Sequence, residues 1–388
     1  MSSPFHRRPF PDYFLSSPLA TLIYPLHQLL NHLRGPPHLP PPNARPIRVV
    51  CISDTHTLEY PDVPDGDLLI HAGDLCNDGS AREIQAAVNW LRSLPHPHKV
   101  VICGNHDSYF DTRSRLPEDR IDASSSHNNT SSTYATISSS TASLRSLDDY
   151  LTDDPHPRID WGDDIHYLQH SSITLTFPPT TASSSSSSSI TSTTPLRPRT
   201  LTIYGAPQIP AIVPFGPEHA FTYPPHHDAW SNTIPASTDI LVTHTPPQSR
   251  LDLSPVYSAG CPFLLSELWR VRPALHVFGH VHAAYGIERV FYDEAQRAWE
   301  RLCASRKSRA RLSRFSSLFG FLRDLFDLSG LVDSARVVLY GVLGVVWARV
   351  WGGENRDAGW VVNAAFFHVI FLVYKGEPRR GKVYTQMQ

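Results

Sequence analysis

The sequence predicts an α/β domain, because strand-like apolar runs alternate with a helical stretch in its first third. Three short apolar runs there end in polar residues or glycine: residues 47–53, 67–72 and 99–103. Between the second and third runs, apolar residues recur at helical spacing over 83–94, and Pro95 follows. Later strand-like runs also end at polar or glycine-bearing motifs, and one closes the fold: residues 201–204, 239–243, 274–278 and 360–373.

The composition of the 388 residues fits a folded domain that carries irregular insertions. Hydrophobic residues make up 41% and charged residues only 18%, while proline is abundant at 35. A formal charge of −2 gives no electrostatic case for nucleic-acid binding. The five cysteines are scattered, without a Cys-x-x-Cys pair, which favours a reducing compartment. We therefore expect a cytoplasmic protein without a secretory signal.

Low-complexity stretches divide the chain. Residues 1–46 are rich in proline and predict a flexible arm with one helix. Residues 111–164 and 178–198 are dominated by Ser, Thr, Asn and Pro, and we interpret them as disordered insertions because core-like strands resume after them. The predicted domain extends over residues 47–375, followed by a tail at 376–388.

Residues 295–355 differ in character and predict a basic and apolar helical insertion. A basic block at 301–314 precedes Phe- and Leu-rich residues at amphipathic spacing over 315–326. The apolar stretch at 337–348 is about a dozen residues long, short of the roughly 20 needed to span a bilayer. Three interpretations stay open: a buried helix, a face that packs on the domain or on a second copy, and peripheral attachment of residues 301–351 to a membrane surface.

Polar side chains collect in five short motifs at the predicted strand ends. The motifs are Asp-x-His at 54–56, Gly-Asp at 73–74, Gly-Asn-His-Asp at 104–107, Thr-His at 243–244 and Gly-His-x-His at 279–282. Asp54 and His56 share one side of the chain if the strand continues through them. Glycine beside such residues lets the backbone approach closely. One such Asp or His alone is more often a cap or surface residue; their combination at strand ends favours a binding site.

The mixture of carboxylate, imidazole and amide groups suits borderline divalent metals such as Mn, Fe or Zn. Seven such side chains are too many for one ion but fit two ions that share a bridging carboxylate. Two ions roughly 3.5–4 Å apart can bind a phosphate and promote its in-line displacement. The sequence therefore predicts a dinuclear metal site.

In this order, the five motifs resemble the calcineurin-like metallophosphoesterase superfamily. Further segments are similar to its metallophosphoesterase-domain-containing branch: HAGD at 71–74, WLRSLP at 90–95, GAP at 205–207, DILVTHTPP at 239–247, GC at 260–261, RPALHVFGHVH at 272–282 and VNA at 362–364. The resemblance covers residues 47–294 and 359–375. It implies a four-layer αββα sandwich, in which two mixed sheets are flanked by helices.

The resemblance also implies the roles of single residues. Asp54, His56 and His282 would hold one metal ion and Asn105, His244 and His280 the other, with Asp74 bridging both. His106 would contact the phosphate and protonate the leaving oxygen, and Asp107 would orient His106. A metal-bridging hydroxide would be the nucleophile.

The function that follows is a metal-dependent phosphoesterase, with a phosphodiester favoured over a monoester on the family branch alone. The expected substrate is a small-molecule phosphate ester such as a nucleotide. The alternatives are a catalytically weak protein of the same fold that binds metal or nucleotide, and a membrane-associated adaptor whose distinctive part is residues 301–351.

Overall fold

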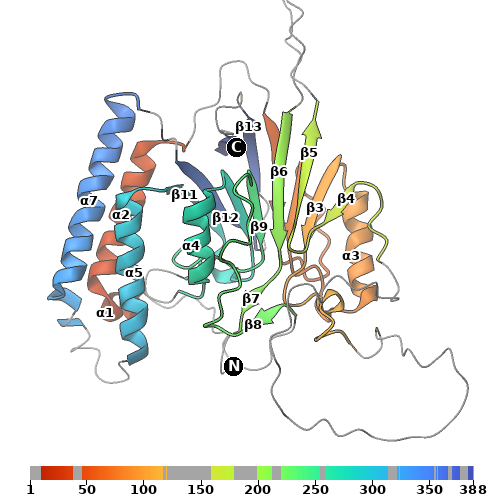
Figure 1. Cartoon of the computed structure of the whole chain (residues 1–388), viewed down its shortest axis with the longest axis horizontal. Helices are drawn as coiled ribbons and strands as arrows, with labels where there is room; N and C mark the ends of the chain where they lie inside the picture. Colours follow the sequence, from red (N-terminus) through yellow and green to blue (C-terminus); the bar gives the residue numbers. More distant parts are fainter. Residues whose placement is uncertain are drawn as a thin grey trace, which may run out of the picture.

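Two six-stranded sheets form the centre of the computed structural model (Figure 1). The structure describes residues 10–37, 46–116, 119, 159–178, 199–211, 220–253, 258–312, 321–322, 324–353, 355, 357–365, 369–375 and 383–387. The first sheet has the order β14 (Val383–Met387), β13 (Val369–Lys375), β1 (Ile47–Ile52), β2 (Leu68–Ala72), β3 (His98–Ile102) and β4 (Ile165–Tyr167). The second has the order β11 (Gly286–Phe291), β12 (Ala358–Asn363), β10 (Leu275–Phe278), β9 (Ile240–Thr243), β6 (Arg199–Ala206) and β5 (Ser171–Phe177).

Both sheets are mixed, and the central strands of both are buried on both faces. In the first, β1 to β4 run parallel, β13 is antiparallel to β1, and β14 is antiparallel to β13. In the second, β6, β9, β10 and β12 run parallel, and the edge strands are antiparallel. Such sheets must be covered on both sides, so their strands read as continuous apolar runs, as in the sequence. A small pair, β7 (Ile209–Pro210) and β8 (Thr222–Tyr223), lies outside them.

The hydrophobic core has three layers, which establish the four-layer arrangement. Val49 and Val100 of the first sheet pack against Ile240 and Val277 of the second. The opposite face of the first sheet packs against helix α3 (Ala81–Ser93), and that of the second against α4 (Pro262–Val271). The predicted αββα sandwich is therefore confirmed, and the strands predicted before residue 300 lie within one or two residues of those observed.

The prediction of a flexible N-terminal arm is wrong for the described residues 10–37. They form helices α1 (Phe10–Ser16) and α2 (Pro18–Arg34), and Ser17 caps α2 by accepting a hydrogen bond from the Ala20 amide. His27 and Asn31 interrupt the apolar pattern, but they are buried, and His27 stacks on Trp299 at 5.3 Å. The proline-rich composition predicted one helix in a flexible arm, whereas residues 10–37 form two helices, and α2 packs against the rest of the protein.

The predicted 295–355 insertion is helical. Together with α2 its helices form one layer, called the helical layer below. Helices α5 (Glu294–Leu312) and α7 (Leu328–Arg349) pack against each other and against α2. Most of the predicted amphipathic stretch at 315–326 lies outside the described residues. The apolar stretch at 337–348 was expected to be too short to cross a membrane, but it belongs to α7, whose 22 residues are enough by length and composition. The interpretation as a buried helix is also wrong, because only 22% of the apolar window of α7 is buried.

The chain end and the insertions also differ from the prediction. The run at 360–373 is two strands, β12 and β13, which lie in different sheets, and the predicted tail contributes strand β14. The central parts of both predicted insertions, 120–158 and 179–198, lie outside the described residues. The predicted insertion at 111–164 extends too far toward its C-terminal end, because Trp161 belongs to the folded domain: its ring stacks on that of Tyr167 with centroids 5.0 Å apart.

A buried arginine joins the second sheet to the helical layer. Arg250 is 1% exposed, and its guanidinium donates to Glu288 of β11 at 2.6 Å and to Glu300 of α5 at 2.9 Å. Removing one partner of a buried ion pair leaves the other charges desolvated and unpaired. The interaction therefore fixes how the helices sit on the sheet.

We predict that Arg250→Ala lowers the free energy of unfolding by about 3–5 kcal/mol, since two buried carboxylates lose their counter-ion. The control is Arg92→Ala, which removes the exposed pair with Asp160 and should leave the free energy of unfolding nearly unchanged, because solvent screens such a pair. Urea unfolding followed by circular dichroism measures both. Equal losses in the two variants would contradict the structural role of Arg250.

Candidate metal centre

The candidate site lies where the carboxyl ends of the parallel strands of both sheets meet. Asp54, Asp74 and Asn105 follow β1, β2 and β3, and His244 and His280 follow β9 and β10. The two sheets come together at this edge through a bridge between Ser53 and Ala365. Open α/β sheets place their binding sites at such carboxyl ends.

The side chains reach the site from left-handed turns rather than from continued strands. Strand β1 ends at Ile52, so Asp54 and His56 do not share a strand face as predicted. The φ angles of Asp54, His56, Asp74 and His280 are 55°, 47°, 54° and 66°. This region is unfavourable for residues with a Cβ, and such strain concentrates at functional sites. These turns direct the side chains of successive motifs toward the same site.

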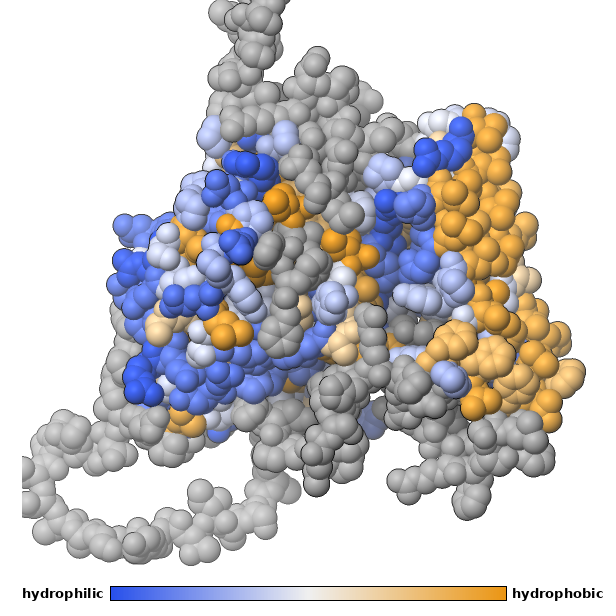
Figure 2. Space-filling model, turned by 180° about the vertical axis from the view of Figure 1, so that it is seen from behind, coloured by the Kyte–Doolittle hydropathy of each residue, from blue (hydrophilic) through white to orange (hydrophobic). Residues whose placement is uncertain are grey.

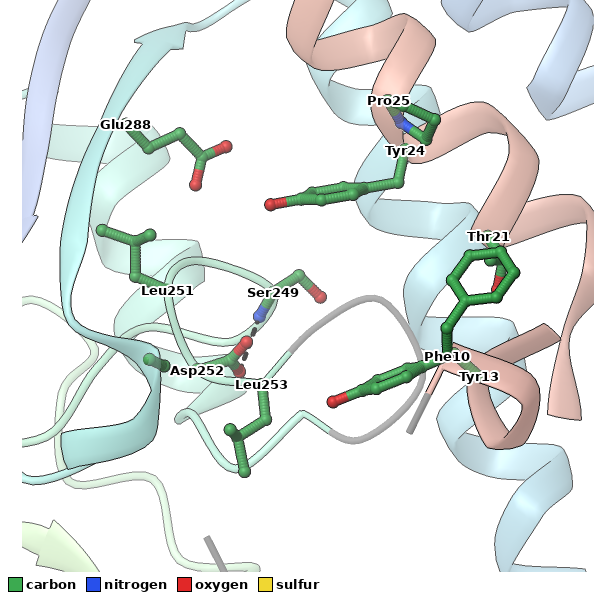
Figure 3. A pocket seen from close by; sticks show the side chains of 11 residues that line it. Phe10, Tyr13, Thr21, Tyr24, Pro25, Ser249, Leu251, Asp252, Leu253 and Glu288 are labelled. Atoms are coloured by element: carbon green, nitrogen blue, oxygen red, sulfur yellow. Dashed lines mark hydrogen bonds between the residues drawn. The ribbon is translucent and has the colours of Figure 1, made fainter. Parts of the chain in front are cut away.

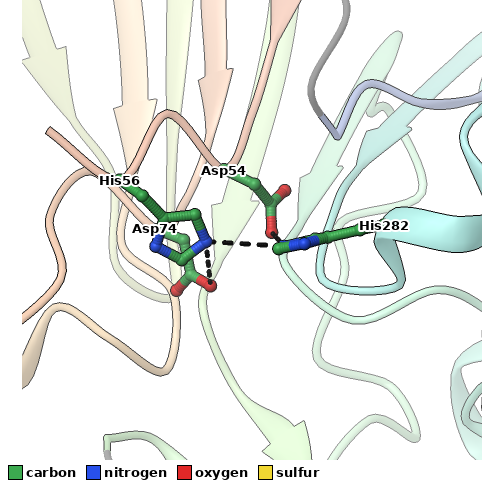
Figure 4. Close-up of side chains that lie close together, drawn as sticks. All are labelled: Asp54, His56, Asp74 and His282. Carbon is green, nitrogen blue, oxygen red and sulfur yellow. Dashed lines mark hydrogen bonds and ion pairs between the residues drawn. The ribbon is translucent and has the colours of Figure 1, made fainter. Parts of the chain in front are cut away.

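Four side chains form the first cluster, shown in Figure 4: the ligand atoms of Asp54, His56, Asp74 and His282 all lie within 4.8 Å of one another. The Nε2 of His282 is 3.0 Å from Asp54 Oδ1 and 3.4 Å from the Nε2 of His56. His56 Nε2 is 3.8 Å from Asp74 Oδ2. Two carboxylates and two imidazoles that converge in this way can hold a divalent cation.

A second cluster surrounds Asn105. Its Oδ1 lies 3.0 Å from His244 Nε2 and 2.9 Å from His280 Nδ1. The Nδ1–H of His244 donates to the Ala72 carbonyl at 2.9 Å, which directs Nε2 toward Asn105 and toward Asp74 Oδ1 at 3.4 Å. A cation bound here would take the place of the proton on His244 Nε2 between these oxygen atoms.

The electrostatics of the site also favour a cation. Asp54 and Asp74 are buried, which by itself would raise their pKa values, but the surrounding histidines hold the pKa of both below the usual value. Burial would lower the pKa of His244, but the Asp74 and Asp54 carboxylates outweigh it and raise the pKa to about 9. Burial lowers the pKa of His280 to about 3. Both carboxylates are therefore charged at neutral pH.

Three glycines allow this close packing. A Cβ on Gly104 would overlap Asp74 Oδ1, and one on Gly279 would overlap Asp54 Oδ2. Gly73 has a φ of +99°, and a Cβ there would lie 2.6 Å from His244 Nδ1. The sequence prediction that glycine beside these motifs serves close approach is confirmed.

Asp107 has a different partner from the one predicted. Its carboxylate accepts hydrogen bonds from the amides of Gly104 at 2.7 Å, Leu75 at 2.9 Å and Cys76 at 3.2 Å, so it ties the loop after β3 to the loop after β2. The ring of His106 is oriented by the Asn77 carbonyl, 3.0 Å from its Nδ1. The imidazole of His106 lies beside that of His56, with ring centroids 4.8 Å apart.

Two positioning residues had no predicted role. The side-chain amide of Asn363 donates to the carbonyls of Leu251 and Val281, at 3.1 and 2.9 Å, and so supports the segment that carries His280 and His282. Asn77 supplies the carbonyl for His106 and donates through its side chain to the His56 carbonyl at 3.0 Å. Neither has a sequence signal beyond the resemblance of 362–364. The structure thus brings all predicted site residues together, while their roles as ligands stay a prediction.

A cavity of about 370 Å³ lies between the N-terminal helices and the segment after β9 (Figure 3). Tyr13 and Tyr24 point into it from α1 and α2. The opposite wall includes Asp252, which accepts hydrogen bonds from the Ser249 and Gly260 amides, and Ala284 of η5 (His282–Ala284). The helical layer therefore helps to shape the region beside His282.

Comparisons with known proteins agree with this geometry. Residues 47–284 match the family model described as calcineurin-like phosphoesterase. The chain is 32% identical over 293 residues to human metallophosphoesterase domain-containing protein 1, covering 71% of this chain and 75% of that protein. It is 31% identical to UPF0046 protein K07C11.7 of Caenorhabditis elegans, covering 64% of this chain and 68% of that protein. A protein of Emericella nidulans named probable rhamnogalacturonate lyase C is 35% identical over 66% of this chain, but the match spans only 19% of that protein's length.

We predict that Gly104→Ala strongly reduces metal binding, because the added methyl group would occupy the position of the Asp74 carboxylate. Metal content after loading and desalting, measured by atomic emission, should fall by about tenfold or more, if the displaced group contributes at least 1.4 kcal/mol of binding free energy. Gly352→Ala is the control for backbone strain alone, since its φ of +63° disfavours any residue with a Cβ, but the added methyl group meets nothing within 4 Å. Normal metal content in Gly104→Ala would contradict the predicted close packing.

Proposed function

Because this chain belongs to the calcineurin-like phosphoesterase family, in the branch of the metallophosphoesterase domain-containing proteins, we propose that it hydrolyses phosphate esters at a dinuclear metal centre. The observation that carries the proposal is the position of Asp74. Its Oδ2 faces His56 of the first cluster and its Oδ1 faces His244 of the second. One carboxylate between two sets of donors is the arrangement that two ions sharing a bridging ligand require.

The proposed ligands divide between the two clusters. Asp54, His56 and His282 would hold one ion, and Asn105, His244 and His280 would hold the other, with Asp74 available to both. The hydrogen bond from His244 Nδ1 to the Ala72 carbonyl fixes the orientation of the His244 ring, and the His280 amide, 3.0 and 3.1 Å from the two Asp54 oxygens, fixes that of the Asp54 carboxylate. Mn, Fe and Zn suit this mixture of oxygen and nitrogen atoms.

Hydrolysis joins the oxygen of a water molecule to phosphorus and breaks the bond to the leaving oxygen, which must gain a proton. Two divalent ions, when bound, supply Lewis acidity toward the phosphoryl oxygens and toward water. His106 is the proposed general acid. Since its Nδ1–H donates to the Asn77 carbonyl, Nε2 is the nitrogen assigned to proton transfer. The proposed task of Asp107 is to hold the two loops that carry Asp74 and His106.

The preferred ester is proposed on the family branch: a phosphodiester rather than a monoester, with nucleotides among the candidates. We also propose a reducing location such as the cytoplasm. The five cysteines are all free and buried, which is consistent with a protein that does not rely on disulfides.

A phosphoesterase panel on metal-stripped protein tests the proposal. The protein is restored separately with Mn, Fe, Zn or Mg and assayed with diesters, monoesters and nucleotides. We expect hydrolysis that depends on the added metal. Tight binding of two ions without turnover of any ester would instead favour the alternative of a catalytically weak binding protein.

We predict that Asp74→Asn is the most damaging single change of a ligand, because one carboxylate serves both ions. Turnover should fall by about 10³-fold, the scale of losing a main transition-state-stabilising group, and elemental analysis should show loss of both ions. Asp160→Asn, at an exposed ion pair with Arg92, is the control. Two tightly bound ions with near-normal turnover in Asp74→Asn would exclude the bridging role.

We predict that His106→Ala keeps its metal content but slows turnover by about 10²-fold, the scale expected for removal of a general acid. The loss should shrink for esters of nitrophenol, which leave without protonation. Steady-state kinetics over a series of leaving groups measures this. An equal loss for every leaving group would point to phosphate binding as the role of His106.

A further inference from the structure

Helix α7 buries mostly small residues against its neighbouring helices and exposes its large apolar residues on the molecular surface. Its buried stripe consists of Gly330, Ser334, Val337 and Gly341. The stripe meets α2 closely, since a Cβ on Gly341 would lie 2.7 Å from Leu30. The exposed apolar residues run along the whole helix: Leu328, Leu331, Val332, Leu339, Tyr340, Val342, Leu343 and Trp347. A surface helix in water has the opposite arrangement.

The apolar surface continues beyond α7. Leu22, Leu29 and Leu33 of α2 are exposed at spacings that place them on one face of that helix. Figure 2 shows a continuous apolar surface along the edge of the molecule that α7 forms. Large contiguous apolar patches on a folded protein mark an interaction site.

The pattern matches a helix that faces lipid. Helices pack in membranes through small residues that let the backbones approach, because large apolar side chains gain as much from lipid as from a neighbouring helix. Trp347 and Trp351, 52% and 68% exposed, stand at the C-terminal end of α7. Tryptophan is enriched where a protein meets the bilayer interface.

Charged groups beside α7 favour a position on the bilayer surface rather than across it. Arg301 of α5 pairs with Asp333 of α7 at 3.1 Å, and Arg349 donates to the Leu33 carbonyl at 2.7 Å. If α7 crossed the bilayer in this packing, the charged residues of α5 and α2 would enter the hydrocarbon, at about 2.5–3.5 kcal/mol for each charge. A helix parallel to the surface immerses only its outer face.

The charge of the helical layer favours anionic lipid over a second copy of the chain. Residues 306–312 of α5 include four basic residues and no acidic residue. Helix α5 packs against α7, and residues 306–312 are the last turns of α5. It would be attracted to anionic head groups, each basic residue near the surface contributing an attraction that salt weakens.

From these observations we infer that the outer faces of α7 and α2 bind the surface of a bilayer that contains anionic lipid. The apolar side chains enter the interface, and the basic residues in the last turns of α5 add an attraction to anionic head groups. The catalytic sheets stay in water, attached through the helical layer. This surface is separate from the proposed metal ligands, so membrane binding and phosphoesterase activity can be tested independently.

Flotation of the full-length, metal-loaded protein with vesicles tests the inference. We expect binding to phosphatidylcholine vesicles that contain phosphatidylserine to exceed binding to pure phosphatidylcholine by about tenfold, and to weaken in high salt. The variant Leu339→Gln/Leu343→Gln should lose this binding by about tenfold or more. The control is Leu58→Gln, since Leu58 is 54% exposed and Leu339 57%, but Leu58 lies in the loop after β1.

A second readout reports the depth of the helix. Brominated lipids should quench tryptophan fluorescence in the wild type, and Trp347→Phe/Trp351→Phe should remove most of that quenching. Near-ultraviolet circular dichroism and metal content establish that each variant is folded.

Failure of the folded wild type to float, or equal flotation of the Leu339→Gln/Leu343→Gln variant, would overturn the inference. Equal binding to both vesicle types would overturn the role of the basic segment, and a dimer that requires Leu339 and Leu343 but ignores vesicles would assign the surface to a second copy.

Discussion

The burial of two carboxylates, Asp54 and Asp74, is the constraint on which the architecture of the site depends. Within the part of the chain that the structure describes, the ion pairs of both are with histidines rather than with lysine or arginine. Buried charge is costly unless it is paired or binds a metal. The left-handed turns, the glycines at 73, 104 and 279 and the hydrogen bonds of Asp107 all serve to hold these two groups within reach of one another.

The sequence was sufficient for the parts of the site that depend on strand ends. Each motif follows an apolar run, and parallel strands bring their carboxyl ends to one edge, so convergence of Asp54, Asp74, Asn105, His244 and His280 could be predicted. The turn conformations could not, because positive φ at Asp54 or His56 is imposed by tertiary contacts that local sequence does not encode. For Asp107, the resemblance implied that it orients His106, whereas in the structure its carboxylate accepts hydrogen bonds from backbone amides.

The helical layer shows the limit of pattern-based prediction more clearly. His27 and Asn31 interrupt the apolar stretch of α2, yet both are buried: His27 stacks on Trp299, and the Asn31 amide lies 3.3 Å from His27 Nε2. The apolar stretch at 337–348 was judged too short to cross a bilayer because Ser334 and Arg336 precede it, but the helix that contains it starts at Leu328 and has 22 residues. Arg250 then links this layer to the second sheet, and the cavity between α1, α2 and the segment after β9 lies against the turn that begins at His282. The helical layer is thus packed directly against the region of the candidate metal centre.

The central claim is that one carboxylate bridges two ions at the joint edge of the two sheets. Electron paramagnetic resonance of protein loaded with two equivalents of Mn²⁺ tests it directly, because two manganese ions that share a ligand are magnetically coupled. The structure predicts a spin-coupled signal that develops only as the second equivalent binds. A signal of isolated Mn²⁺ at full loading, with the intensity of two independent ions, would contradict a bridged centre at Asp74.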